Sequence, residues 1–123
     1  MRTLTLTCAL KALNAELLAG DLKAAESVPV KGGCACDLLS WVMAKGEADF
    51  LWMTVQGHVN AAAVCLLRDM PAIVLTCGRS ADADLILRCQ QENIFLASTQ
   101  LTTFEASGAL YTAFEKSASE SKE

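Results

Sequence analysis

The chain contains a single histidine, His58, and none of the sequence motifs that define a class of enzyme. No serine or cysteine is linked to His58 by a known pattern, so a catalytic triad is unsupported. The phosphate-binding motifs G-x-x-x-x-G-K-S/T and G-x-G-x-x-G are also absent, which leaves a glycine-rich phosphate loop with little support. We therefore predict a protein that is not an enzyme.

Charge and long apolar runs are scarce as well. Only 20% of the residues are charged, the net charge is -4, and Lys and Arg are scattered singly, which opposes binding to nucleic acid or an anionic membrane. No stretch approaches the roughly 18 apolar residues of a membrane span, and the first ten residues lack the apolar core of a signal peptide. We expect a cytoplasmic protein with reduced cysteines, whose partners are small molecules and proteins.

Apolar residues, by contrast, are abundant for so short a chain. They make up 53% of the 123 residues, and the mean hydropathy is +0.33. A single domain of this kind should keep an apolar patch after its core is covered, which predicts a homodimer. Four large side chains belong either to this patch or to the core, depending on their exposure: Trp41, Met43, Trp52 and Met53.

Residues 116–123 hold no apolar side chain larger than alanine and predict a disordered tail behind a domain of residues 1–115.

The clearest structural signal lies in residues 50–68. FLWMTVQ (50–56) is a continuous apolar run rich in strand-forming residues, and AAAVCLLR (61–68) is a helical stretch of small residues. A strand that is apolar on both faces is typical of a sheet covered on both sides. We expect Asn60 to cap the helix, which should stop near Met70 because Pro71 disfavours a helical residue before it.

The same alternation continues to the C-terminus. AIVLTC (72–77) and IFLAS (94–98) are predicted strands, each followed by a helix; Asn93 ends the first helix, and Thr102 with Glu105 forms a capping box for the second. The apolar face of the last helix is made of Phe104, Gly108, Tyr111 and Phe114. Three such alternations with short links predict a three-layer α/β/α sandwich with a mostly parallel sheet.

The first half of the chain is less regular. Four leucines recur at helical spacing and predict a helix capped by Thr5 or Thr7: Leu6, Leu10, Leu13 and Leu17. The alternation of residues 4, 6 and 8 also fits a short strand. Residues 15–20 predict an extended piece, and residues 28–30 predict an edge strand because of Pro29.

Gly32-Gly33 predicts a bend, followed by a short helix. Asp37 can cap this helix, and Lys45-Gly46 closes it. Its apolar face would consist of Leu38, Leu39, Val42 and Met43.

Open α/β sheets usually bind their ligands at the carboxyl ends of the strands. The candidate ligand-binding residues follow predicted strands: Gly32, Gly33, Gln56, His58, Asn60, Cys77, Gly78 and Thr99. Parallel order would bring them to one rim, where open backbone and a helix start favour a small anionic ligand. His58 would orient the ligand; alternatively, it is simply a polar cap or turn residue.

The cysteines allow two interpretations. Structural thiols are favoured, because four cysteines sit singly among apolar residues: Cys8, Cys65, Cys77 and Cys89. Cys34 and Cys36, however, flank a single residue, and this spacing can place two thiolates on zinc or on an iron-sulfur cluster. No C-x-x-C pair is present to supply the two further ligands of a tetrahedral zinc.

In four segments the chain resembles the small stand-alone form of the DRTGG domain family: residues 32–43, 50–64, 72–78 and 94–111. Of the naming motif Asp-Arg-Thr-Gly-Gly, only Gly32-Gly33 is present. The resemblance implies a fold similar to the amino-terminal domain of HPr kinase/phosphorylase. It also implies a regulatory or dimer-forming module, like the related domains within phosphotransacetylases and CBS-domain pyrophosphatases. Some stand-alone members accompany iron-only hydrogenases, which implies a redox enzyme as partner protein.

The leading hypothesis is therefore a non-catalytic regulatory or scaffold domain without a cofactor, which dimerises and binds a small anionic or nucleotide-like ligand. The alternative is a hydrogenase-associated accessory protein that handles metal or iron-sulfur clusters through Cys34 and Cys36. A third and weaker hypothesis is a small enzyme that uses His58.

Overall fold

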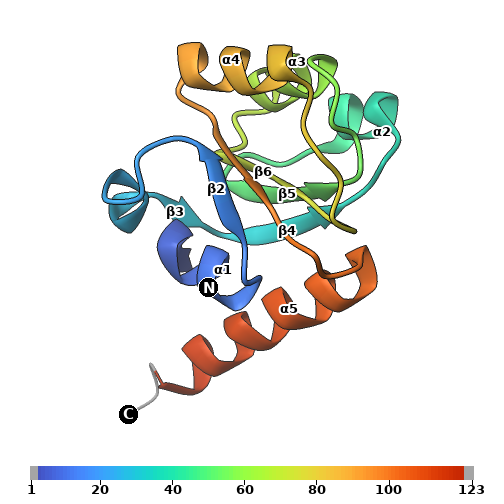
Figure 1. The fold of residues 1–123 in the computed structure, drawn as a ribbon. Coiled ribbons are helices and arrows are strands. Elements are labelled where there is room, and N and C mark those ends of the chain that lie inside the picture. The colour runs from blue at the N-terminus through green and yellow to red at the C-terminus, as the bar shows by residue number, and fades with distance from the viewer. Residues whose placement is uncertain (1–2, 121–123) are drawn as a thin grey trace.

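The computed structural model of the chain describes residues 3–120, with side chains up to residue 117 (Figure 1). Its main sheet has five strands in the order β2 (Glu16–Ala19), β7 (Phe95–Ser98), β6 (Ala72–Leu75), β5 (Phe50–Thr54) and β4 (Gly32–Ala35). The last four are parallel, and β2 is antiparallel to β7. A smaller sheet pairs β1 (Leu4–Thr5) with β3 (Pro29–Val30), and η1 (Ala24–Ser27) precedes β3.

Helices cover both faces of the main sheet (Figure 1). One face carries α2 (Leu39–Lys45), α3 (Asn60–Leu67) and α4 (Ala83–Glu92), and the other carries α1 (Leu6–Ala12) and α5 (Thr103–Glu120). This is the predicted three-layer sandwich with a mostly parallel sheet. None of the described helices is long and apolar enough to cross a membrane.

The central strand β5 is buried on both faces, which explains its continuous apolar run. Leu51 and Met53 pack into the core under α1 and α5, whereas Trp52 packs into the core under α3 and α4. Side chains alternate between the faces of a strand, so a sheet with two covered faces needs an apolar residue at every position. The predicted end signals also hold: Gly46 caps α2, and Asn93 ends α4 with a left-handed φ of 59°.

Gly32-Gly33 was predicted as a bend, and this is wrong. Both glycines lie in β4 and pair with Phe50 and Leu51. A Cβ on Gly32 would come within 2.5 Å of the Phe50 ring, and one on Gly33 would come within 2.8 Å of Leu110 Cδ2. Glycine is needed here because neighbouring side chains pack directly against the strand backbone.

Two predicted helix caps are also wrong. Leu38, not Asp37, is the residue before α2, and Asn60 is the first residue inside α3. Leu38 and Met43, which were expected to face the core, are exposed, and Val42 is the fully buried residue of α2. α3 ends at Leu67, ahead of the predicted stop.

The amino-terminal segment contains both of the structures that its pattern allowed. After β1, Thr5 caps α1, and its Oγ1 accepts a hydrogen bond from the Cys8 N–H at 3.1 Å. The helix ends at Ala12, and Asn14, with φ 50°, turns the chain. Leu17 therefore lies in β2 and not in the helix.

α5 begins with the predicted capping box. The Thr102 N–H donates to Glu105 Oε1 at 3.0 Å, and the Glu105 N–H donates to Thr102 Oγ1 at 3.1 Å. The predicted apolar face is wrong, however, because Phe104 is 88% exposed and Tyr111 is 63% exposed. The buried face consists of Ala106, Leu110 and Phe114. The helix runs to Glu120, so the predicted tail begins inside it, and residues 121–123 lie outside the described part of the chain.

The single cysteines fall into two groups. Cys65 and Cys89 are buried in the core, and burial raises the pKa of Cys65 to about 12 and the pKa of Cys89 to about 11. Cys8 and Cys77 are exposed. The prediction of buried structural thiols is therefore confirmed for the first pair and wrong for the second.

We expect Gly32→Ala to lower the free energy of unfolding by about 1–3 kcal/mol, because three atoms of the Phe50 ring lie within 2.8 Å of the added Cβ. Denaturant unfolding measures this change. The matched control is Ala35→Ser, at an exposed position of the same strand, which should stay within about 0.5 kcal/mol. Equal stability of Gly32→Ala and the wild type would contradict the close packing of Phe50.

Thiol labelling at pH 8 should separate the two groups of cysteines. Because the thiolate is the reactive form, a raised pKa keeps the thiols of Cys65 and Cys89 protonated and slow to react. Cys8 and Cys77 should be alkylated first, and mass spectrometry of peptides from the native protein follows the order. Labelling of Cys65 as fast as Cys77 would show that the core opens readily.

Candidate functional site

The predicted ligand-binding residues divide between the two ends of the sheet. The parallel strands β4, β5, β6 and β7 end side by side, with Ala35 opposite Met53, Thr54 opposite Leu75, and Leu75 opposite Ser98. Six of the predicted residues follow these ends and share one edge, which we call the carboxyl rim: Gln56, His58, Asn60, Cys77, Gly78 and Thr99.

Gly32 and Gly33 are not part of the rim. They pair with the first residues of β5 and therefore lie toward the amino end of the sheet. Their misplacement follows directly from the bend prediction, because a bend after the Val28–Val30 segment would have put them at a strand end.

Asp37 is the rim residue that the sequence did not reveal. Its Oδ1 accepts hydrogen bonds from Thr54 Oγ1 at 2.8 Å and from the Val55 N–H at 2.9 Å, and its main-chain oxygen accepts one from Gln56 Nε2 at 2.8 Å. Asp37 therefore joins the end of β4 to the end of β5. The only signal for this role would have been a carboxylate directly after a strand, and β4 itself was not recognised.

His58 acts as a cap for α3. Its Nδ1 accepts a hydrogen bond from the Asn60 N–H at 3.2 Å, so Nδ1 carries no proton in this arrangement. The ring is exposed. The bond to Asn60 fits the interpretation of His58 as a polar cap or turn residue.

The loops of the rim are tied to one another. The Gly57 oxygen accepts a hydrogen bond from the Asp82 N–H at 2.9 Å, which joins the loop after β5 to the loop after β6. Cys77 and Gly78 both have left-handed φ values, 60° and 65°, and the Cys77 N–H donates to the Leu101 oxygen at 2.7 Å. The rim is therefore a rigid frame.

Thr99 is at the rim but is used within the protein. It is buried, and its hydroxyl donates to the Leu13 oxygen at 2.7 Å while it accepts from the Leu101 N–H at 3.2 Å. The hydroxyl groups of Thr76 and Thr103 likewise form a hydrogen bond to each other, with 2.6 Å between their oxygens. Exposed polar side chains at the rim include those of Asp37, His58 and Asn60, and Arg79 and Ser80 are exposed in the loop after β6.

Cys34 and Cys36 lie at and just beyond the end of β4. Burial raises the pKa of Cys34, and the neighbouring Cys36 and Glu47 raise it further, so this thiol stays protonated at neutral pH. Cys36 Sγ lies 3.8 Å from the Leu38 oxygen. Within residues 3–120 no group of three His, Cys, Asp or Glu residues is placed to hold a metal ion, so a metal at these thiols would need ligands from outside that range.

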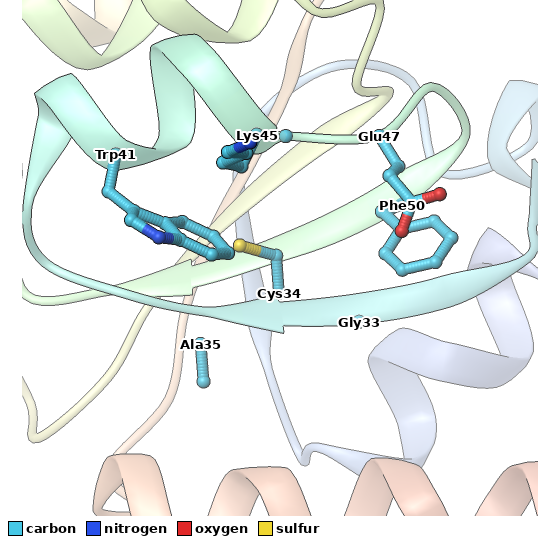
Figure 2. Close-up of a pocket in the computed structure, with 8 residues that line it drawn as sticks. Gly33, Cys34, Ala35, Trp41, Lys45, Glu47 and Phe50 are labelled. Atoms are coloured by element: carbon cyan, nitrogen blue, oxygen red, sulfur yellow. The ribbon is translucent and has the colours of Figure 1, made fainter.

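A cavity of about 240 Å³ lies beside Cys34, between α2 and β4. Figure 2 shows the indole of Trp41 reaching down from α2 toward the Cys34 thiol, with Glu47 and Phe50 together at the other end. Lys45, at the end of α2, also lines the cavity. No pattern in the sequence predicts this cavity, because the cavity depends on β4 being an edge strand.

No family model matches the chain, and no curated protein matches it. A solved structure that is similar comprises the CBS and DRTGG domains of the regulatory region of Clostridium perfringens pyrophosphatase, in complex with the activator diadenosine tetraphosphate. The TM-score is 0.70 at 16% sequence identity. The likeness covers 89% of this chain and 47% of the other, so the present chain spans about half the length of that chain. At this identity the likeness shows the fold, and it confirms the DRTGG-like α/β fold that the resemblance implies.

Proposed function

We propose that the chain is a non-catalytic regulatory domain that dimerises and binds a small anionic or nucleotide-like ligand at the carboxyl rim. The observation that carries this proposal is the convergence of the loops after β5, β6 and β7 on one rigid rim, in a fold shared with a regulatory region that was solved with a nucleotide activator. Rigid loops at the strand ends of an open α/β sheet are the usual place for a ligand. The cytoplasmic location stays a prediction.

The charges at the rim favour one part of it for the anion. Asp82 and Asp84 lie at the start of α4 and would repel an anion there. α3 has no acidic residue in its first turn, and His58 and Asn60 lie exposed at its start. The N–H groups of Asn60, Ala61 and Ala62 are already bonded within this turn, so the donors there are the exposed side chains of His58 and Asn60, beside the positive end of the helix dipole. We therefore place the anionic group against His58 and Asn60, with Arg79 of the neighbouring loop as the cation.

The dimer interface that fits best is the outward face of α5. Phe104, Gly108 and Tyr111 recur there at helical spacing, and the two aromatic side chains are largely exposed. A Cβ built on Gly108 meets nothing within 4 Å. Two aromatic residues around a glycine would let the same helix of a second copy approach closely, and such aromatic anchors carry much of the energy of an interface. The Trp41 side of α2 is a second exposed apolar area, whereas Trp52 and Met53 are buried.

The ligand is tested by thermal shift with ATP, AMP and diadenosine tetraphosphate. A nucleotide at 100 times its Kd should stabilise the native protein by about 2.7 kcal/mol. Amide shift changes in a titration with the best nucleotide should cluster on residues 56–60 and 77–80. Asn60→Ala should weaken the affinity by roughly tenfold, the expected effect of losing a hydrogen bond to a charged group.

The control for this titration is Gln90→Ala, which removes an exposed side-chain amide on α4 outside the rim loops. Its affinity should equal that of the wild type. His58→Asn keeps a cap acceptor for α3 but removes the ring, so it separates the two roles of His58. Shifts that cluster on α2 or α1, with unchanged affinity in all variants, would move the site away from the rim. Iron or zinc bound to anaerobically purified protein, and lost in Cys34→Ser/Cys36→Ser, would favour the metal-handling alternative instead.

Sedimentation equilibrium tests the dimer. We expect a dimer at tens of micromolar and a shift toward monomer in Phe104→Ser/Tyr111→Ser, with Kd raised at least roughly tenfold because such anchors each contribute about 1–2 kcal/mol or more. Leu87→Ser, at a half-exposed leucine of α4, is the control and should leave the mass unchanged. A monomeric wild type would contradict dimerisation, and a dimer that resists the double substitution would exclude α5 as its interface.

A further inference from the structure

The cavity between α2 and β4 is lined by two charged side chains of opposite sign. Lys45 and Glu47 lie two residues apart and both line it. Among the side chains that the structure describes, neither of them forms a hydrogen bond or an ion pair, whereas Lys31 pairs with Asp49 at 3.3 Å close by. The cavity thus presents one free cation and one free anion.

The remaining walls add no charge. Trp41 and Phe50 are aromatic, and the Cys34 thiol between them is neutral at physiological pH because burial and Glu47 raise its pKa. Trp41 is 49% exposed, so half of a large aromatic surface is left for contact with something other than the core. In Figure 2 this surface, the thiol and the Glu47 carboxylate border the same space.

One wall is the open edge of the sheet. β4 is the last strand in the order and pairs only with β5 among the described strands. Gly33 and Ala35 are exposed and have little or no side chain to cover the backbone. An edge strand presents unpaired N–H and C=O groups, which can bind both an ammonium and a carboxylate.

Charge and size together select the ligand. A nucleotide carries several negative charges and would meet Glu47, and a simple cation would meet Lys45. A zwitterion satisfies both side chains. The volume of about 240 Å³ lies below the roughly 300–1,000 Å³ of pockets that hold drug-sized molecules, so the ligand is small.

We propose that this cavity binds a free α-amino acid with an apolar side chain. Glu47 receives the α-ammonium group, Lys45 receives the α-carboxylate, and the side chain rests against Trp41. The site is lined by other residues than the carboxyl rim and goes beyond the nucleotide-like ligand proposed there, so the full chain would have two ligand sites.

The test uses L-leucine, L-methionine and L-phenylalanine as probes in amide-shift titrations of the full chain. We expect saturable shifts on residues 33–35 and 41–50. Two analogues of the best probe dissect the charges: the N-acetyl form lacks the ammonium, and the amide lacks the carboxylate. Each should bind roughly tenfold more weakly, as expected for the loss of a charge-assisted hydrogen bond.

Variants assign each charge to its partner. Lys45→Met should lower the affinity for the amino acid roughly tenfold but leave the affinity for the amide unchanged. Glu47→Gln should also lower the affinity for the amino acid roughly tenfold, but leave the affinity for the N-acetyl form unchanged. Matched controls are Lys11→Met and Glu26→Gln, exposed residues of α1 and η1, which should bind like the wild type. The amide spectrum of each variant shows that it is folded.

Three outcomes would overturn the proposal: no saturable shift up to about 10 mM of any probe, equal binding of the amino acid and both analogues, or shifts that cluster on the rim. Because the nucleotide titration uses other residues and other variants, failure here leaves the proposal for the rim standing, and the reverse also holds.

Discussion

The buried indole of Trp52 needs a hydrogen-bond acceptor, and the way it finds one organises the edge of the sheet. Its Nε1–H donates to the Cys36 oxygen at 2.8 Å. A buried indole N–H without an acceptor would destabilise the folded protein. This hydrogen bond therefore holds the chain just after β4 against β5. Asp37, the next residue, then accepts from Thr54 and Val55. The short edge strand β4 is thus held in place by hydrogen bonds of the two residues that follow it, in addition to its own pairing with β5.

This arrangement explains which parts of the structure the sequence could predict. Residues 50–105 follow rules that act locally, such as the continuous apolar runs of strands covered on both faces, the left-handed Asn93 and the Thr102 capping box, and these elements are predicted from the sequence. β4 depends on contacts that are distant in sequence: Gly32 is a strand residue because Phe50 packs against it, and Gly33 because Leu110 does. A glycine pair locally favours a bend over the interior of a strand, so the sequence alone predicts the bend.

The error in α5 has a similar origin. Aromatic residues at positions 104 and 111 predict a buried face, since large apolar side chains are usually buried. The side chains of α5 that pack on the sheet are instead those of Ala106, Leu110 and Phe114, while Phe104 is exposed. Asp37 was missed for a related reason: its role depends on two strands ending side by side, and only one of them was recognised.

The rim and the cavity also differ in what their polar groups already do. At the rim, Asp37, Thr99 and Gly57 are engaged in bonds that fix the loops, so a ligand finds a rigid frame with few free groups. In the cavity, Lys45 and Glu47 have no hydrogen bond or ion pair among the side chains that the structure describes. The helix beside them, α2, has seven residues, of which Val42 is buried. Segments with few buried contacts open at low cost in free energy. The chain around α2 is held at Asp37 and at the Gly46 oxygen, which accepts from Arg68 Nε at 2.9 Å. If the proposed ligand fills the cavity, we expect α2 to adjust its position more than the sheet does.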